Sequence, residues 1–449
     1  MVDARRQKAE LGVGWARSGD SWGSVTIRRE WRSGIFLSLA AALITLFALE
    51  VGLRLAVSPS LFSSGRLAGV ELPPVSLFLP EEAPDPPASG ALAGPVVRDT
   101  TLSYGDLGGA PRPDPRIGYA PLEGFESLRG WWRTNSLGAR ADGETPPEVP
   151  EGRIRILVFG DSFAAGSRLP QDETWSMNLA ALDERLDIVN FGVDGYGTGQ
   201  AFLRYQDRSG HLEHDVVLLM VVPAADLWRD VNVRRDLGEA WSSWTVMPRF
   251  VVATDGLELI PDPLSAGSMP QADREQRLEV LEDHVRRYDH FFREDLYELP
   301  PVVGHSVLFR IALAALDQWE SRDLRRHILL PESEAVRVTA GIVGAMRAEV
   351  ERSGRQFVLV LAPTGHELAR SQLPTPDADA WHDLAAALCE GAGTCIDLID
   401  AMMDSPASES DFGYDGTHYG PKTSRRLAEV LLSELRAQGL VPERAPREW

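Results

Sequence analysis

A serine and a histidine that lie far apart in this sequence have the surroundings that nucleophilic catalysis needs. Ser162 follows a Gly-Asp dipeptide directly after the apolar run 154–159, and Asp415 and His418 stand three residues apart near the C-terminus. A serine hydroxyl attacks at neutral pH only when an imidazole removes its proton, and a carboxylate fixes the tautomer of that imidazole. The sequence therefore predicts a triad in which Ser162 is the nucleophile, His418 the base and Asp415 the orienting acid.

These residues can meet only if the fold brings two distant loops together, and the apolar pattern predicts a fold that does so. Short apolar runs without polar alternation are typical of strands buried on both faces, and their alternation with helical stretches predicts a parallel sheet. The predicted strands are 155–159, 188–191, 216–222, 357–361 and 395–398, and the helical connections include 174–186, 334–353 and 423–438.

The predicted fold class is therefore α/β, a three-layer α/β/α doubly wound sheet of flavodoxin type with about five strands. Ser162 falls at the carboxyl edge of the first predicted strand. Open α/β sheets bind their ligands at that edge.

Charge limits the class of function. The chain has 449 residues and a formal net charge of −21 at pH 7. A chain this acidic, without a basic face, cannot neutralise a row of phosphates, which argues against a partner of the nucleic-acid class.

The segment 34–57 is almost wholly apolar and about as long as a bilayer core requires, roughly 20 residues. Its two charged residues, Glu50 and Arg54, are four apart and can pair on one helix face. Arginines lie before the segment, so the positive-inside rule puts the tail 1–33 in the cytoplasm and everything after the segment outside, in the periplasm or at the cell surface.

Three interpretations of this segment stay open: an uncleaved membrane anchor, a cleaved signal peptide and a buried helix of a soluble domain. We favour the anchor, because the stretch before the segment is long and no clear A-x-A site follows. The first two interpretations both export the rest of the chain.

Composition divides the remainder into three regions. Residues 58–97 are rich in proline, glycine and serine and predict an extended linker that lifts a domain off the membrane. An irregular lead-in at 98–150 precedes the main domain at 151–440.

One connection within the main domain is abnormally long. More than a hundred residues separate the third predicted strand from the fourth, with the insertion at about 233–330. It contains a predicted strand pair around 249–260, a charged helix near 272–293 and a second helical stretch around 306–319. Insertions at this edge often form lids or substrate-selecting walls, and a structural embellishment or a dimer surface is the alternative.

The two cysteines, Cys389 and Cys395, are six residues apart beside the final predicted strand. In a reducing cytosol they would be thiols, whereas in an oxidising compartment they could close a small disulfide loop.

Four segments of the chain resemble the SGNH/GDSL hydrolase superfamily, specifically its exported bacterial members with an N-terminal membrane anchor. The resemblance covers about 113–438 and rests on RIRILVFGDSFAAG, NFGVDGYGTGQ, DGTHYGPKTSRRLAEVL and the upstream TNSLGAR. It implies that Ser162 is the nucleophile, Asp415 the acid and His418 the base, that Gly195 supplies an oxyanion N–H, and that no metal or organic cofactor is required.

Physical reasons support these roles. The backbone N–H of Ser162 can point at a developing oxyanion, and Gly195 has no Cβ, so an acyl oxygen can approach its N–H closely. The glycine-rich segment 192–199 could instead suggest a phosphate loop. It lacks both the G-x-G-x-x-G order and the lysine of a P-loop, which argues against a nucleotide-binding sheet protein.

The chain departs from the family at one position. Family members usually carry an asparagine after the third strand whose side chain donates to the oxyanion, and Ala225 stands there in this chain. Losing one such donor typically costs about a hundredfold or more in rate. Two backbone donors could suffice, Asn232 could substitute, or catalysis could be weak or lost.

The leading hypothesis is a membrane-anchored serine esterase that acts on an acylated glycan, a lipid or a small ester outside the cytoplasm. An O-acyltransferase is the first alternative, because hydrolysis and transfer share one acyl-enzyme. A glycan-binding scaffold without turnover is the second. The sequence leaves the acyl group, the acceptor and the oligomeric state open.

Overall fold

Five parallel strands form the centre of the structure. The computed structural model describes residues 23–56, 66–67, 70–72, 104–234, 246–264, 274–297, 299–300, 304–364, 377–398, 402 and 417–443. The sheet has the order β11-β10-β7-β5-β6. Its strands are β5 (Ile154–Phe159), β6 (Leu186–Asn190), β7 (Val216–Val221), β10 (Gln356–Leu361) and β11 (Thr394–Asp397).

Numbered along the chain, these strands have the flavodoxin-like order 2-1-3-4-5, which confirms the predicted fold class. The predicted strand ends differ from the observed ones by one or two residues.

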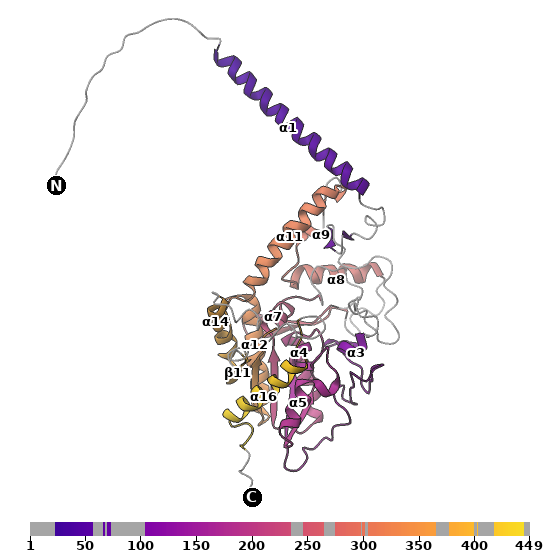
Figure 1. Cartoon of the computed structure of the whole chain (residues 1–449), viewed down its shortest axis with the longest axis vertical. Helices are drawn as coiled ribbons and strands as arrows, with labels where there is room; N and C mark the ends of the chain where they lie inside the picture. The colour runs from indigo at the N-terminus through magenta and orange to yellow at the C-terminus, as the bar shows by residue number, and fades with distance from the viewer. Residues whose placement is uncertain are drawn as a thin grey trace, which may run out of the picture.

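Helices cover both faces of the sheet (Figure 1). Side chains alternate along each strand, so in β5 Ile156 and Val158 pack on one face and Leu157 and Phe159 on the other. The first face packs against α5 (Trp175–Leu182) and α16 (Pro421–Ala437), and the second against α6 (Thr198–Arg208), α7 (Pro223–Asp230), α12 (Glu334–Arg352) and α14 (Asp377–Cys389).

Helix α5 ends earlier than the prediction of 174–186. Asp183 is extended at φ −144° and ψ 108° and caps the helix. Its carboxylate accepts hydrogen bonds from the backbone and side chain of Arg185 and from Arg436 of α16. These bonds hold the pKa of Asp183 well below its usual range. The carboxylate stabilises a turn here instead of another helical turn, and Leu186 already belongs to β6.

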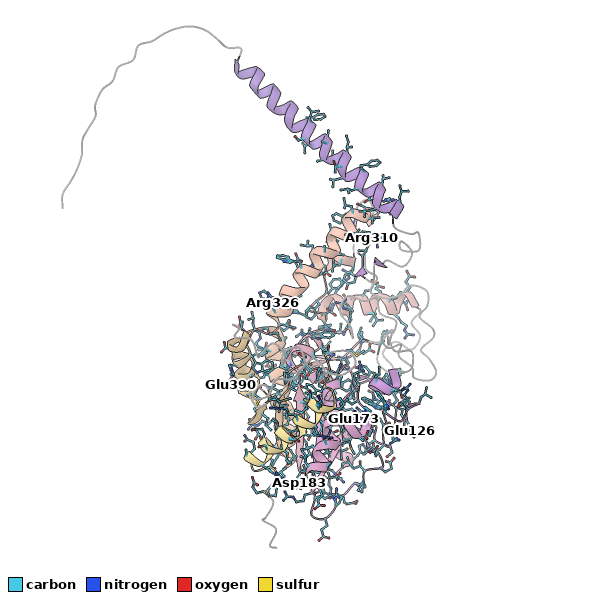
Figure 2. The ribbon with its side chains drawn as sticks, in the orientation of Figure 1. Glu126, Glu173, Asp183, Arg310, Arg326 and Glu390 are labelled. Atoms are coloured by element: carbon cyan, nitrogen blue, oxygen red, sulfur yellow. A yellow bond between two sulfur atoms is a disulfide. The ribbon has the colours of Figure 1, made fainter. Side chains whose placement is uncertain are left out.

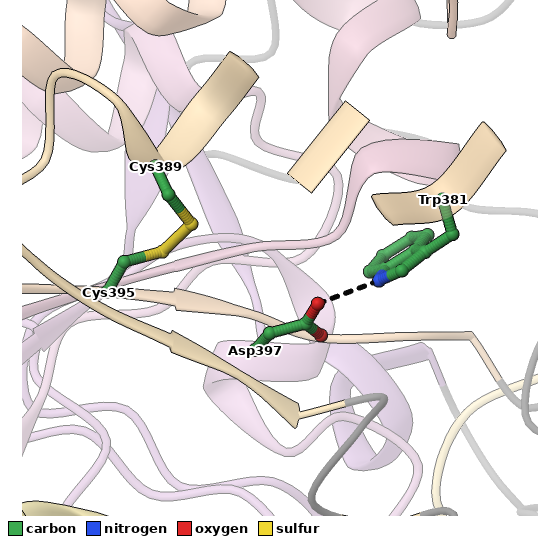
Figure 3. The surroundings of a disulfide bond; sticks show 4 residues. All are labelled: Trp381, Cys389, Cys395 and Asp397. Carbon is green, nitrogen blue, oxygen red and sulfur yellow. Dashed lines mark hydrogen bonds between the residues drawn. A yellow bond between two sulfur atoms is a disulfide. The ribbon is translucent and has the colours of Figure 1, made fainter. Parts of the chain in front are cut away.

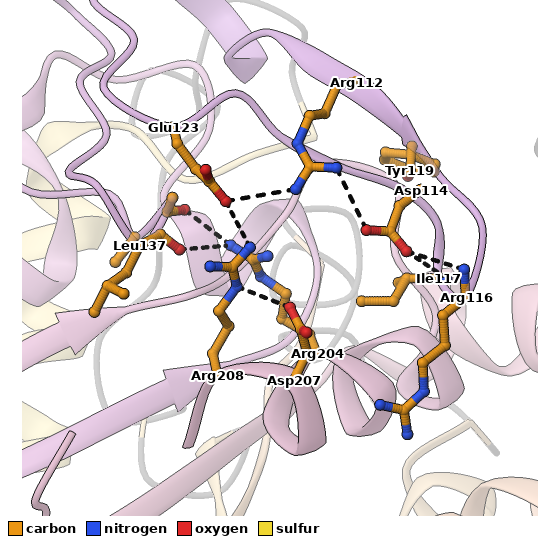
Figure 4. A network of polar contacts seen from close by, with 12 residues as sticks. Arg112, Asp114, Arg116, Ile117, Tyr119, Glu123, Leu137, Arg204, Asp207 and Arg208 are labelled. Atoms are coloured by element: carbon orange, nitrogen blue, oxygen red, sulfur yellow. Dashed lines mark hydrogen bonds and ion pairs between the residues drawn. The ribbon is translucent and has the colours of Figure 1, made fainter. Parts of the chain in front are cut away.

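The lead-in before β5 is more ordered than expected. It contains the helix α3 (Tyr104–Gly108) and an antiparallel pair, β3 (Pro111–Asp114) and β4 (Gly118–Pro121). Two arginines of α6 bind it (Figure 4): Arg208 pairs with Glu123 at 2.7 Å, and Arg204 donates to the carbonyl of Gly138 at 3.1 Å. The lead-in is thereby fixed to the main domain.

Arg140 joins the lead-in to the loop that follows Ser162. It is buried, and its guanidinium donates to the carbonyls of Ala165 and Gly166 at 2.8 and 2.7 Å and to that of Leu169 at 2.7 Å. It also bonds Trp131 and Gln171.

The Arg140→Ala variant would leave several buried carbonyls without donors. We expect it to lose about 3–5 kcal/mol of unfolding free energy, measured by urea denaturation. Arg153→Ala, at an exposed arginine, is the control and should change stability by less than about 0.5 kcal/mol. Equal effects of the two variants would contradict this role of Arg140.

The insertion between β7 and β10 contains the predicted strand pair and helices with different ends. The pair consists of β8 (Arg249–Ala253) and β9 (Gly256–Ile260), and the helices within the described part of the insertion are α8 (Arg274–Tyr288), α9 (Glu294–Tyr297) and α11 (Val307–His327). Helix α8 ends before the predicted 293 because Asp289 accepts from the backbone N–H of Phe291 and pairs with Arg234. Helix α11 begins after its cap Ser306, as predicted, and runs eight residues beyond the predicted end at 319.

His284 on α8 makes the insertion sensitive to acid. Burial lowers its pKa to about 4. In the unfolded chain His284 has a pKa near 6.5 and binds a proton that it does not bind in the folded chain. The free energy of unfolding is therefore unaffected by His284 above pH 6.5 and decreases as the pH falls towards 4.

Between pH 7 and pH 5, we expect the free energy of unfolding of the His284→Phe variant to decrease by about 1–2 kcal/mol less than that of the native chain. Urea midpoints at the two pH values measure this. The comparison cancels groups common to both chains, such as Asp262, whose pKa burial raises to about 6. Parallel losses in both chains would contradict the prediction.

At the N-terminal side, α1 (Gly23–Ala56) contains a candidate membrane span at Phe36–Leu55 with a mean hydropathy of 2.2. None of this span is buried in the described part of the chain. The helix extends N-terminally beyond the predicted segment 34–57.

The predicted linker differs from the expectation where the structure describes it. It contains a short antiparallel pair, β1 (Arg66–Leu67) and β2 (Val70–Glu71), and the carbonyl of the buried Leu72 accepts a hydrogen bond from Arg310 of α11 at 2.9 Å. Residues 73–103, most of the predicted linker, lie outside the described residues.

A disulfide joins Cys389 at the end of α14 to Cys395 in β11 (Figure 3). The indole of Trp381 on the same helix donates to Asp397 at 2.9 Å. The edge strand β11 is therefore held to α14 at two points.

Candidate active site

Ser162 and His418 meet at the carboxyl edge of the sheet. Nε2 of His418 lies 2.8 Å from Oγ of Ser162, although 256 residues separate the two in sequence. When Nε2 carries no hydrogen, the serine hydroxyl donates to it, which is the contact that a general base needs. Asp415, the predicted acid, lies outside the described residues.

The turn after β5 presents Ser162. Gly160 has φ +149°, and a Cβ there would lie 2.5 Å from the carbonyl oxygen of Met220 on β7, so only glycine fits. Asp161 then caps α4 (Ser162–Ala165), its carboxylate accepting from the N–H of Phe163 at 2.8 Å. As the first residue of α4, Ser162 has a backbone N–H with no carbonyl partner within the helix.

Aromatic contacts fix the position of His418. Its ring stacks on Phe163, the residue after the candidate nucleophile, with centroids 4.6 Å apart. The neighbouring Tyr419 packs edge-on against Phe163 and donates its hydroxyl to the carbonyl of Pro363 at 2.5 Å. Phe163 thus packs on the imidazole, and Tyr419 ties the next residue to the loop after β10.

The loop that carries Gly195 lies against the serine turn. The N–H of Val193 donates to the carbonyl of Gly160 at 3.1 Å. Gly195 itself is half-buried with φ +81°, and the carbonyl of the preceding Asp194 accepts from the hydroxyl of Tyr119 at 2.8 Å. The backbone around the predicted oxyanion glycine is therefore fixed by buried neighbours.

Ala225 lies in the first turn of α7, directly after β7, where its methyl group donates nothing. Asn232 lies beyond the other end of α7, and its amide nitrogen already donates to the carbonyl of Trp228 at 3.0 Å. This amide lies at the opposite end of α7 from Ala225, so the structure gives no support to Asn232 as a substitute donor.

A buried ionic cluster that the sequence did not predict lies one helical turn from Ala225. Nη1 of Arg229 lies 3.4 Å from the carboxylate of Asp161, 3.2 Å from that of Asp226 and 3.1 Å from the carbonyl of Tyr196. These three partners belong to the loops after β5 and β6 and to α7 after β7. One guanidinium therefore ties together the segments that carry Ser162, Gly195 and Ala225.

The cluster is short of positive charge. Burial raises the pKa of Asp161, while Arg229, the N–H of Phe163 and the charge of His418 oppose the rise. Burial and the nearby Asp161 raise the pKa of Asp226 well above its usual range. Despite burial, the two carboxylates raise the pKa of Arg229.

The sequence held part of the signal for this cluster. Asp226 and Arg229 are three apart in a helix that directly follows a buried strand, which predicts an ion pair near the carboxyl edge. Asp161 was visible only as part of the Gly-Asp-Ser turn. Its pairing with Arg229, 68 residues away, is fixed by the crossover of the sheet.

No protein-family model matches the chain, and no curated protein matches it in sequence. Solved structures do show likeness. LAE5, an alpha/beta hydrolase enzyme from the metagenome of Lake Arreo, Spain, is 14% identical, and the match covers 63% of this chain and 94% of that one with a TM-score of 0.33. The lipase/acylhydrolase from Enterococcus faecalis is 14% identical, over 65% and 100% of the two chains, with a TM-score of 0.33.

A variant of Axe2, an acetyl xylan esterase from Geobacillus stearothermophilus, is 11% identical, over 65% of this chain and 97% of that one, with a TM-score of 0.33. Likenesses with such low identities and TM-scores carry no argument here. The fold is therefore argued from the strand order, and the chemistry from the geometry of the site.

Proposed function

We propose that this chain is a serine esterase that hydrolyses O-acyl esters, O-acetyl esters among them, on a cell-envelope glycan or lipid. The contact of 2.8 Å between Ser162 and His418 is the observation that carries the proposal. Ser162 attacks the ester carbonyl, His418 takes the proton and returns it to the leaving alcohol, and Asp415 orients His418. The backbone N–H groups of Ser162 and Gly195 stabilise the oxyanion.

The proposed esterase is anchored in the membrane by α1 and acts outside the cytoplasm. The length and hydropathy of Phe36–Leu55 support the anchor, and the arginines that precede it support a cytoplasmic N-terminus. The disulfide between Cys389 and Cys395 is consistent with an oxidising compartment.

A serine-directed probe tests the proposal directly. The full chain in detergent micelles should hydrolyse an aryl acetate and should react with a fluorophosphonate, and mass spectrometry should place the label on Ser162. A folded chain that neither hydrolyses the aryl acetate nor is labelled by the fluorophosphonate would contradict the proposed activity.

Two alternatives share this site. An O-acyltransferase would use the same acyl-enzyme, and mass spectrometry of products with and without glycan acceptors separates transfer from hydrolysis. The methyl group of Ala225 in place of a donor favours a second alternative, a glycan-binding scaffold without turnover. A glycan that binds the chain equally well with and without Ser162, in the absence of any hydrolysis, would favour that scaffold.

A further inference from the structure

The half of α11 nearest α1 carries a line of exposed apolar side chains. Phe309, Leu316 and Trp319 are 42%, 44% and 68% exposed, and Ala312 is exposed between them. Their spacing of three, four and three residues places all four on one side of the helix. An aligned set of exposed apolar side chains marks a contact surface. We call these four residues the α11 stripe.

The N-terminus of α11 is joined to α1 by Glu50. The Glu50 carboxylate accepts hydrogen bonds from the backbone N–H groups of Val307 and Leu308 at 3.0 and 2.9 Å and from the hydroxyl of Ser306 at 3.0 Å. N–H groups in the first turn of a helix lack partners within it and carry partial positive charge, so a carboxylate from another helix stabilises them.

Arg54 completes this joint. It pairs with Glu50 at 2.6 Å and donates to the carbonyl of His305. Two charged residues of the candidate span therefore find their partners on each other and on the start of α11, and the first turn of α11 is fixed at the level of Glu50.

The joint lies inside the candidate span. The span Phe36–Leu55 has 20 residues, which at about 1.5 Å per residue matches a hydrocarbon core about 30 Å thick. Glu50 precedes Leu55 by five residues, or about 7.5 Å. An interfacial helix buries its apolar face about 5–10 Å into the boundary between headgroups and acyl chains. An α1 that crosses the bilayer thus places the start of α11 at that depth.

Helix α11 does not continue the line of α1. It turns away at the joint and runs back towards the sheet domain (Figure 1), with Arg310 near the joint and Arg326 near the far end (Figure 2). A helix that leaves a membrane-spanning helix at an angle, at interfacial depth, runs along the membrane surface. Tryptophan and phenylalanine are typical of that layer.

We propose that the α11 stripe lies in the outer interface of the bilayer, so that the chain contacts lipid at two places, α1 and α11. This inference rests on the membrane anchor of the proposed function. Continuity with the span identifies lipid as the occupant, because the joint fixes the start of α11, next to the near end of the stripe, at the C-terminal part of the candidate span.

Depth-dependent quenching tests the proposal on the full chain in lipid nanodiscs. Single-cysteine variants Leu316→Cys and Trp319→Cys, with the native cysteines held in their disulfide, carry an environment-sensitive fluorophore. Leu128→Cys, at a residue that is 93% exposed in the lead-in, is the matched control. Lipids with a nitroxide near the start of the acyl chain should quench positions 316 and 319 about twofold or more and leave position 128 unchanged.

Equal quenching at positions 316 and 128 would overturn the proposal. Leu316→Cys chains that cross-link to each other without being quenched would also overturn it, because the stripe would then contact a second copy. A chain that stays out of the discs would overturn the anchor and the stripe together. None of these measurements needs an ester, so a chain that is quenched at Leu316 and inactive on esters would contradict only the proposed hydrolysis.

Discussion

The Ser162→Ala variant is expected to lose ester hydrolysis by a factor of about 10⁴ or more and to lose all labelling by a fluorophosphonate. The substitution removes only the hydroxyl group that contacts His418. The methyl group that remains cannot form an acyl-enzyme. The turn itself should persist, because Gly160 and the cap at Asp161 are unchanged. Aryl acetate hydrolysis by the full chain measures the loss.

Ser353→Ala is the matched control for this variant. Ser353 caps the C-terminus of α12, just before β10, and therefore lies at the opposite edge of the sheet from Ser162. The Ser353→Ala variant should still be labelled by the fluorophosphonate at Ser162 and should hydrolyse the aryl acetate at the native rate. Should Ser162→Ala retain a substantial fraction of the native rate, Ser162 would not be the nucleophile and a different group would have to carry the reaction.

Replacing Arg229 by methionine should produce the other large effect. The variant would keep much of the volume of the side chain but leave the carboxylates of Asp161 and Asp226 buried without a cation. We expect a loss of about 3–5 kcal/mol in unfolding free energy. Activity should fall as well, since Arg229 ties the segments that carry Ser162 and Gly195.

The dependence on pH identifies the cause of this loss. Buried carboxyls with raised pKa values bind protons in the folded chain at a pH where the unfolded chain has released them, so their cost is absent at low pH and grows as the pH rises. Removing Arg229 should raise the pKa of Asp161 and of Asp226 further. The difference in urea midpoint between Arg229→Met and the native chain should therefore be larger at pH 8 than at pH 5.

A second substitution provides the rescue. Asp226→Asn in the Arg229→Met background removes one uncompensated charge and keeps an oxygen that can accept from the N–H of Val222. It should recover part of the lost stability. A difference that is independent of pH and unaffected by Asp226→Asn would assign the loss to packing, contrary to the ionic explanation.

The strands and the Ser162–His418 pair were predictable because each depends on a local pattern. Val216–Val221 is a run of apolar residues and is buried throughout, as a strand covered on both faces must be. Ser162 follows β5 directly, and His418 directly precedes the predicted last helix. Carboxyl ends of parallel strands share one edge, so loops that leave them can meet.

The features that were missed depend on contacts between distant residues. The acceptors of Arg229 come from segments after three different strands, and their convergence follows from the sheet order. The pair of Glu50 with Arg54 was predicted from their spacing and is confirmed. The bond from Ser306 to Glu50 joins residues 256 apart, and no spacing rule predicts it. This joint also brings α11 to α1, where the linker pattern predicted a domain lifted away.

In the exported enzyme that we propose, the cross-link between α14 and β11 would give the candidate site an order of maturation. Ser162 follows the interior strand β5, whereas the segment with His418 comes after β11, which among the described strands lies at the edge and pairs with β10 alone. In the exported chain that we propose, the bond between Cys389 and Cys395 would form only after export, because the cytoplasm keeps thiols reduced. Ser162 would then be positioned before His418 is fixed in place. The newly made chain would therefore be inactive towards esters in the cytoplasm. Alkylation of free thiols, followed in time alongside the onset of labelling at Ser162, would reveal this delay.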